Sequence, residues 1–213
     1  TGLSERRRRD FDAAIAEYDS TLAYNADSAE GLLGVGVLAA QRGDSAAAEM
    51  AYRAAIARNP GFAAAYINLA DSLRLNGMES EANAALLDAI DGPAGDDAAL
   101  HAALGLSHVR LGATEAAMES LARAAELAPD DPYHAYTYGL ALASVESREA
   151  ALAYFAEVSD RVPGYAPILI ALATMNRDAG RIDVAREFAR RLLEVSPGDA
   201  SGIALERELA LQP

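Results

Sequence analysis

Small and apolar residues recur along the chain with a period of 34 residues. Pro129, Pro163 and Pro197 mark this period, since each lies 34 residues after the one before it. Glycine recurs at a second position of the repeat, in Gly43, Gly77, Gly112 and Gly180. Five residues further on, each copy has a small alanine: Ala48, Ala82, Ala117, Ala151 and Ala185. Four residues later, four copies have a large apolar residue: Tyr52, Leu86, Leu121 and Phe155. This fixed spacing predicts a tandem repeat.

Each repeat is predicted to be a pair of antiparallel helices. The recurring glycine supplies the left-handed backbone conformation that ends a first helix, and the recurring proline follows a second helix and stops it. Hydrophobic residues make up 52% of the chain and many are alanine, the best helix former. Because one repeat cannot bury its apolar face alone, neighbouring repeats must stack into a continuous core. The sequence therefore predicts an all-α protein.

The segment AAAYINLADSLRLNGMESEANAALLDAI, residues 63–90, carries the most complete copy of the pattern. Its signature positions are Tyr66, Leu69, Ala70, Leu73, Gly77, Ala82, Leu86 and Ala89. This copy resembles the tetratricopeptide repeat, a helix pair of 34 residues. The resemblance extends over nearly the whole chain and implies a right-handed superhelical solenoid of antiparallel helix pairs. We expect five repeats, at residues 29–62, 63–97, 98–131, 132–165 and 166–199. Residues 1–28 would form a basic segment and a lone repeat helix, in FDAAIAEYDSTL, and residues 200–213 a capping helix.

Two repeats depart from the pattern. The copy at residues 63–97 has 35 residues and ends in the loop DGPAGDD, residues 91–97, which we interpret as a flexible joint between two halves of the stack. The copy at residues 132–165 has Glu146 where the others have the turn glycine. A left-handed residue other than glycine would cost about 1 kcal/mol there, unless the turn is remodelled.

The charge of the chain bears on its partners. The formal net charge is −14, with 18 basic residues that are all arginine. Such an acidic surface repels nucleic-acid phosphates and anionic lipids, so neither is an expected partner. The run from Arg6 to Arg9 is interpreted as a solvated helix end or linker rather than a contact patch. No apolar run approaches the length that spans a bilayer, so no direct membrane insertion is expected.

No catalytic or cofactor-binding motif is present in the sequence. The chain has no cysteine, which excludes disulfides, thiolate metal sites and cysteine nucleophiles from this segment. GLLGVG, residues 31–36, falls within a predicted helix and follows no strand, so its glycines indicate close packing rather than a dinucleotide site. His101 and His108 are seven residues apart on one predicted helix, roughly 10 Å along its axis, so we expect core histidines rather than metal ligands. We therefore expect no catalysis, no metal and no cofactor.

The family resemblance also implies where a partner binds. In tetratricopeptide proteins the first helices of the repeats line a concave groove that takes a peptide or a partner protein. Position by position, the implied groove residues are Ile67, Asn68, Asp71, Arg74, Leu106, Arg110, Tyr133, Tyr136, Leu140, Ile170 and Thr174. Asn68 matches the asparagine with which peptide-binding members hold a ligand main chain. No basic residue occupies the positions that clamp a carboxylate in chaperone-tail adaptors. In PYHAYTYG, residues 132–139, Tyr133 and Tyr136 are the predicted aromatic anchors, whereas Tyr138 and Gly139 are assigned to the core and His134 to neither.

The sequence leaves three functions open. The first is a non-enzymatic scaffold that binds a peptide or helix of a partner protein in an apolar groove. The second is an accessory module of a larger enzyme or electron-transfer protein, because the run DAAIAEYDSTLAYNADSAEGL resembles the C-terminal part of some bacterial multihaem cytochrome proteins. The chain begins at Thr1 rather than methionine, so we expect a piece of something longer, cytoplasmic or, with the cytochrome resemblance, periplasmic. The third is self-assembly, and the sequence predicts no oligomeric state.

Overall fold

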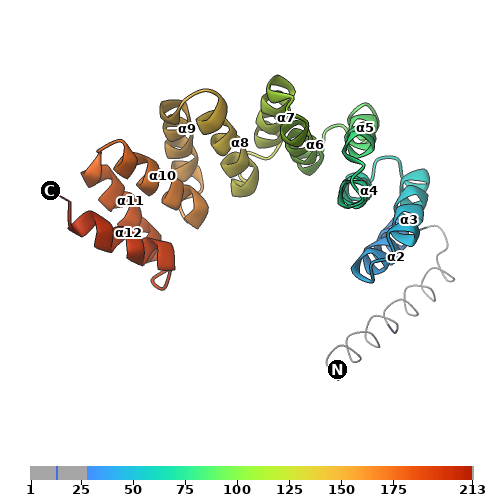
Figure 1. Ribbon diagram of the computed structural model, residues 1–213, viewed down its shortest axis with the longest axis horizontal. Coiled ribbons are helices and arrows are strands. Elements are labelled where there is room, and N and C mark those ends of the chain that lie inside the picture. Colours follow the sequence, from blue (N-terminus) through green and yellow to red (C-terminus); the bar gives the residue numbers. More distant parts are fainter. Residues whose placement is uncertain (1–12, 14–27, 213) are drawn as a thin grey trace. The chain divides into compact units, whose positions relative to one another are not determined.

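The fold is all-α within the part of the chain that the computed structural model describes, which is Ala13 and residues 28–212. These residues form eleven helices and no strand, and Figure 1 shows them arranged as antiparallel pairs. The helices are α2 (Ala29–Gln41), α3 (Ser45–Arg58), α4 (Ala63–Leu75), α5 (Glu79–Ile90), α6 (Ala98–Leu111), α7 (Thr114–Leu127), α8 (Pro132–Val145), α9 (Arg148–Arg161), α10 (Ala166–Asp178), α11 (Ile182–Val195) and α12 (Ala200–Ala210). The Arg6–Arg9 run and, apart from Ala13, the helix predicted in FDAAIAEYDSTL lie outside the described residues.

The helices pack in chain order within two compact units, Thr1–Ser120 and Leu121–Pro213. In the first unit α2 packs on α3, α3 on α4, α4 on α5 and α5 on α6, and α4 also contacts α2 and α6. The second unit repeats this arrangement from α8 to α12, with α10 contacting both α8 and α12. In these contacts each helix packs on helices of its own repeat or of the next repeat, which is the mark of a solenoid-like repeat fold. The predicted fold class is thus confirmed.

The recurring apolar positions form the core. The periodic alanines, from Ala48 to Ala185, are 0–3% exposed, and the large residues four positions later, from Tyr52 to Phe155, are 0–2% exposed. The Tyr52 ring packs on Gly36, and the Phe155 ring packs on Gly139, where the nearest ring atoms leave no room for a Cβ. Small residues at these positions therefore bring the two helices of a pair close together, as the sequence predicts.

Five turns end a first helix in the same hydrogen-bond pattern. Gly43, Gly77, Gly112 and Gly180 adopt φ values of 72–81°, and the N–H of each following residue donates to a carbonyl five residues back, as from Ala113 to His108 at 2.9 Å. At the fifth turn Glu146 keeps a φ of −99°, while Ser147 extends fully at φ −165° and ψ 160°. The Ser147 N–H still donates to the Leu142 carbonyl at 3.1 Å. The turn is thus remodelled, and Glu146 avoids the left-handed conformation.

The loop at residues 91–97 is not the boundary between the two units. The chain divides at Ser120 and Leu121, within α7, so the boundary does not lie at the loop, and the flexibility of the loop stays a prediction. Ala94 in this loop is 5% exposed, and Nε2 of His101 lies 2.8 Å from the Gly95 carbonyl oxygen. These contacts tie the loop to the beginning of α6, inside the first unit.

Two further features bear on function. Helix α12 buries Gly202, Leu205 and Leu209 against α11 and α10 and exposes Glu206, Arg207 and Glu208, so its outer side is polar. None of the described helices is both long enough and apolar enough to cross a membrane.

Replacing Gly139 by alanine tests the close helix contact. The added Cβ would overlap the Phe155 ring, and we expect a loss of about 1–3 kcal/mol in the free energy of unfolding. Gly198→Ala is the matched control, because nothing lies within 4 Å of the position of its Cβ and its φ is not positive. Urea unfolding followed by circular dichroism measures both variants. Equal free energies of unfolding for the two variants would show that the packing of the Phe155 ring does not require glycine at position 139.

Replacing Gly180 and Glu146 by alanine, one at a time, tests the remodelled turn. Gly180→Ala must place an alanine at φ 74° and should cost about 1 kcal/mol of unfolding free energy. Glu146→Ala keeps a negative φ at an exposed position and should change that free energy by less than about 0.5 kcal/mol. The same unfolding measurement applies. A cost at Glu146 as large as that at Gly180 would contradict the remodelled geometry.

Candidate functional site

The predicted groove residues lie on the first helices of the repeats and are divided between the two units. In the first unit, α4 carries Ile67, Asn68, Asp71 and Arg74, and α6 carries Leu106 and Arg110. In the second unit, α8 carries Tyr133, Tyr136 and Leu140, and α10 carries Ile170 and Thr174. The two groups are described separately below.

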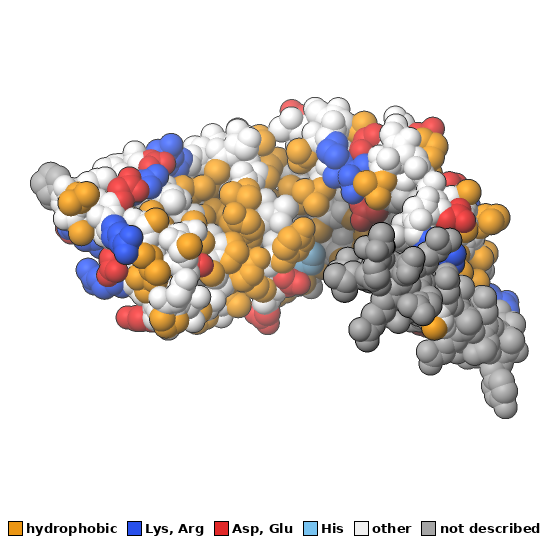
Figure 2. Space-filling model, turned by 60° about the horizontal axis from the view of Figure 1, so that its bottom comes forward, with side chains coloured by type: hydrophobic (Ala, Val, Ile, Leu, Met, Phe, Trp, Pro, Cys, Tyr) orange, Lys and Arg blue, Asp and Glu red, His pale blue; other side chains and the backbone are white. Residues whose placement is uncertain are grey.

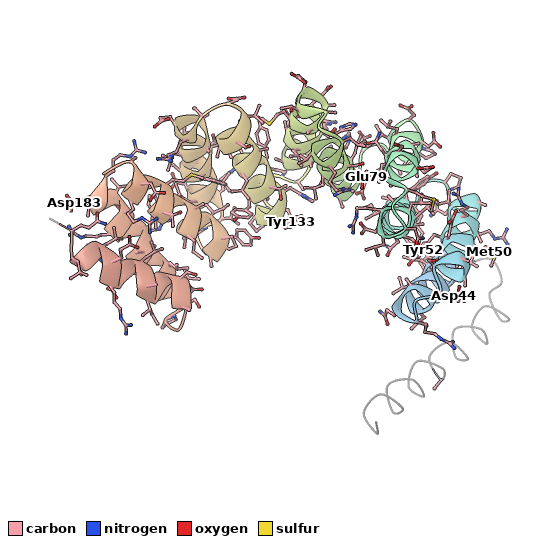
Figure 3. The ribbon with its side chains drawn as sticks, viewed as in Figure 1. Asp44, Met50, Tyr52, Glu79, Tyr133 and Asp183 are labelled. Carbon is pink, nitrogen blue, oxygen red and sulfur yellow. The ribbon has the colours of Figure 1, made fainter. Side chains whose placement is uncertain are left out.

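Tyr133 and Leu140 are exposed on the same face of α8. Tyr133 is 51% exposed and Leu140 is 41% exposed. They are seven residues apart, close to two helical turns, so both project to one side. The helix begins at this point because Asp131 caps it, with its Oδ1 accepting the Tyr133 N–H at 2.8 Å. Figure 3 labels Tyr133 in the first turn of α8.

Tyr136 lies between this exposed face and the core. Its ring stacks on Phe155 of α9, with centroids 6.0 Å apart at 27°, and meets Tyr165 edge-on at 6.2 Å and 70°. Tyr136 is therefore half-buried, unlike the exposed Tyr133. The two tyrosines share a helix face as predicted, but Tyr136 supports the surface while Tyr133 projects from it.

Tyr165 completes this group, and the sequence analysis missed it. Burial first, and then Tyr136, Asp131 and Tyr133, raise the pKa of the Tyr165 hydroxyl. Tyr165 occupies the N-cap of α10 and makes no side-chain cap hydrogen bond. Four equivalent N-caps use their side chains for capping, and they are Ser28, Asp97, Asp131 and Asp199. Phe62, the N-cap of α4, makes no side-chain cap hydrogen bond, as at Tyr165. An aromatic residue at a capping position was the available signal.

We call Tyr133, Tyr136, Leu140 and Tyr165 the aromatic surface. Figure 2 shows hydrophobic side chains gathered over this face of the second unit. On neighbouring α10, Ile170 is half-buried, and the Thr174 hydroxyl donates to the Ile170 carbonyl at 2.7 Å within its own helix. Thr174 therefore satisfies its donor internally, and the aromatic residues provide most of what this face offers to a partner.

His134 lies on the buried side of α8. It is 7% exposed, its ring meets Tyr133 at 5.6 Å and 69°, and its Nε2 is 3.7 Å from Oδ2 of Asp131. His134 thus lies outside the predicted groove face, and its ring lies edge-on to the Tyr133 ring.

The histidines of the first unit make hydrogen bonds within the chain. His101 bonds Gly95, and Nδ1 of His108 lies 3.4 Å from the Ser120 hydroxyl. Among the described residues no group of three or more His, Asp or Glu could hold a metal ion.

On α4, the polar candidates are partly engaged within the helix. Nδ2 of Asn68 donates to the Ala64 carbonyl at 2.8 Å, which leaves Oδ1 as an acceptor. Arg74 contacts Oδ1 of Asp71 at 3.2 Å. Ile67 packs against the core of the first unit, and Leu106 on α6 is half-buried. The side-chain amide of Asn68 therefore keeps Oδ1 and its second N–H for the main chain of an extended peptide.

Two arginines at the far ends of first helices connect helices instead of lining a surface. Arg110 Nε donates to Glu79 Oε1 at 2.8 Å, and the Ser107 hydroxyl donates to the same oxygen at 3.2 Å, which links α6 to α5. Figure 3 shows Glu79 at the start of α5, on the side of α6. In the second unit Arg177 of α10 bonds Glu208 of α12 at 2.8 Å. Arg110 is therefore better placed to join neighbouring repeats than to bind a partner.

Comparisons with known proteins agree with this repeat geometry. A tetratricopeptide repeat family model matches residues 1–61, 38–98 and 136–200, and a second tetratricopeptide repeat model matches residues 98–131. Neither is a haem-protein model, and the resemblance to multihaem cytochrome proteins stays a prediction. Among curated proteins, none matches the chain significantly.

Three solved structures illustrate the likeness in fold. PilW, a type IV pilus biogenesis factor, is 19% identical, with 95% of this chain and 94% of that chain covered and a TM-score of 0.71. PilF of Pseudomonas aeruginosa is 19% identical over 97% and 94% of the two chains, with a TM-score of 0.68. YrrB, a tetratricopeptide protein with an unusual peptide-binding site, is 22% identical over 91% and 100%, with a TM-score of 0.61. With its described helices paired in register and nearly its whole length matched by the family models, the chain belongs to the tetratricopeptide repeat family.

Proposed function

We propose that the protein is a non-enzymatic interaction scaffold that binds a peptide or helix of a partner protein on the first helices of its repeats. The observation that carries the proposal is the aromatic surface of the second unit. Tyr133 and Leu140 are large apolar side chains that stay 51% and 41% exposed on one helix face. Exposed apolar clusters of this kind mark interaction sites, and tyrosine is enriched among residues that dominate binding energy.

The support beneath the exposed residues suits a binding anchor. Tyr136 is held by Phe155 from the core side and by Tyr165 from α10. Side chains that are already ordered lose little rotamer entropy when a partner binds. The aromatic surface therefore offers rigid apolar contacts with phenol hydroxyls at their edges, which suits an amphipathic helix or an extended apolar peptide.

Family membership supports the same conclusion at a coarser level. Tetratricopeptide proteins are in general non-catalytic scaffolds that bind proteins or peptides. YrrB, which shares the fold, is described as having a peptide-binding site. At 22% identity that description does not identify a ligand for this chain, but it shows that a stack of this length can bind a peptide.

Paired alanine variants test the proposal. A phage-displayed peptide library is selected on the immobilised intact chain, and the recovered peptides are measured against Tyr133→Ala/Leu140→Ala. Removing both exposed side chains should lower the affinity of these peptides for the chain by about tenfold or more, because large side chains at an interface centre contribute most of the affinity. Both positions are exposed and Phe155 and Tyr136 are left intact, so helical content should be unchanged.

Val145→Ala/Val195→Ala is the matched control, since these valines are 47% and 50% exposed at helix ends in the same unit. It should bind the peptides as the unaltered chain does. Peptides that bind the Tyr133/Leu140 variant with the same affinity as the unaltered chain would refute the proposal that the aromatic surface binds them. Light scattering at several concentrations separates a further outcome, in which the surface joins copies of this chain and the variant only abolishes self-association.

A further inference from the structure

The first unit contains a cavity that the aromatic surface does not include. It has a volume of about 340 Å³ and lies between the end of α2, the beginning of α3 and the C-terminal half of α4. Its walls include Ala40 and Leu75 as apolar residues and Tyr52, Asn68, Asp71 and Ser72 as polar residues. None of the described residues that line it is basic. The cavity is large enough for one side chain of a partner.

Tyr52 forms the buried part of the cavity. Its ring is 2% exposed and is fixed against Gly36, so the phenol cannot turn away. Burial and then the charge of Asp71 raise the pKa of Tyr52, so its hydroxyl stays protonated. Tyr52 and Asp71 both line the cavity. Tyr52 is the aromatic residue that fills the first repeat's core, and the same side chain therefore presents a hydroxyl to the cavity.

The remaining polar groups face the cavity as acceptors. Nδ2 of Asn68 donates one N–H to the Ala64 carbonyl at 2.8 Å, which fixes the amide orientation, and Oδ1 is the acceptor that the amide offers to an ammonium group. Arg74 engages Oδ1 of Asp71 at 3.2–3.3 Å, and no described residue pairs with Oδ2. The lining thus combines one carboxylate, one amide oxygen and one hydroxyl with apolar walls.

This combination fits the side chain of lysine. A lysine has a four-carbon stem that packs along apolar surface and an ammonium group that donates three hydrogen bonds. Arginine fits less well, because its planar fork prefers both oxygens of a carboxylate and Arg74 already holds one of those of Asp71. All basic residues among residues 1–213 are arginine, so a lysine in this cavity must come from outside these residues.

We propose that this cavity binds a lysine side chain of a partner protein, with Asp71 pairing the ammonium group, Oδ1 of Asn68 and the Tyr52 hydroxyl accepting its hydrogen bonds, and Ala40 and Leu75 contacting its stem. The net charge of −14 favours such a partner, because it attracts basic segments over long range. The proposal goes beyond the aromatic surface and does not depend on it, since all its residues belong to the first unit.

Amide chemical shifts of the intact, isotope-labelled chain test the cavity directly. The probe is N-acetyl-lysine methylamide, with N-acetyl-norleucine methylamide as an uncharged analogue and N-acetyl-arginine methylamide as the competing cation. We expect saturable shifts at Asn68, Asp71 and Ser72 with the lysine probe, at a dissociation constant on the order of 1 mM. The arginine probe should bind several-fold more weakly, and the norleucine probe should cause no saturable shift.

Two variants assign the contacts and a third controls for general attraction. Asp71→Asn keeps the shape of the side chain and removes its charge, so it should raise the dissociation constant of the lysine probe about tenfold or more. Tyr52→Phe keeps the ring on Gly36 and removes the hydroxyl, so it should weaken the probe by roughly two- to tenfold. Asp88→Asn, an exposed acid of α5, should have no effect.

The proposal is overturned if those three amides show no saturable shift at about ten times the expected dissociation constant. It is also overturned if Asp88→Asn weakens the probe as much as Asp71→Asn, since that would mean unspecific attraction to an acidic surface. Circular dichroism of each variant shows that the fold is retained. None of these outcomes concerns the peptides selected on the aromatic surface, so the two proposals fail separately.

Discussion

Contact between a ring and a glycine sets how closely the two helices of a repeat approach. Tyr52 lies on Gly36 and Phe155 lies on Gly139 so closely that a Cβ on either glycine would overlap the ring. At the equivalent places of two other repeats, Ala70 is buried in one core with Leu86, and Ala173 in another with Ala189. In these four pairs the residue on the first helix is always glycine or alanine, whereas the residue on the second helix varies from an aromatic ring to alanine.

The same rings connect the core to the candidate binding sites. Phe155 fills the core against Gly139, and its ring also stacks with the ring of Tyr136. Tyr52 fills the core against Gly36 and also lines the cavity beside Asn68 and Asp71. In both units a residue that holds the fold also fixes the position of a group that a partner would contact. Binding there requires little reorganisation, because packing has already fixed these side chains.

Much of the fold follows from local, periodic signals, and the sequence predicts that part well. The turn glycines, the buried alanines and the large residues that follow them recur at fixed spacing, and their burial confirms the prediction. What the sequence does not reveal involves residues from different repeats. Arg110 and Glu79 are 31 residues apart, and only the packing of α6 on α5 brings them together. Tyr165 appears in sequence as a loop residue, and its role depends on how α10 packs beside α8 and α9.

Local chemistry alone did not decide two other features. The glycine-bearing loop at residues 91–97 has the composition of a flexible joint, yet the chain divides within α7 instead. At Glu146 the sequence left open either a strained or a remodelled turn, and the turn is remodelled, because Ser147 extends and retains the hydrogen bond to Leu142. In each case the residue type constrains one backbone position, whereas the observed structure is decided by hydrogen bonds and burial over several neighbouring positions.

The use of arginine determines what the first-helix faces can offer to a partner. Arg74 pairs with Asp71 on its own helix, Arg110 pairs with Glu79, and Arg177 pairs with Glu208. These cations at the ends of the first helices are thereby engaged by carboxylates of the chain, and the middle of each helix has no cation of its own. The groups left for a partner are acceptors, apolar side chains and phenols. A surface of that composition discriminates against acidic and phosphorylated ligands and favours apolar segments that carry basic residues.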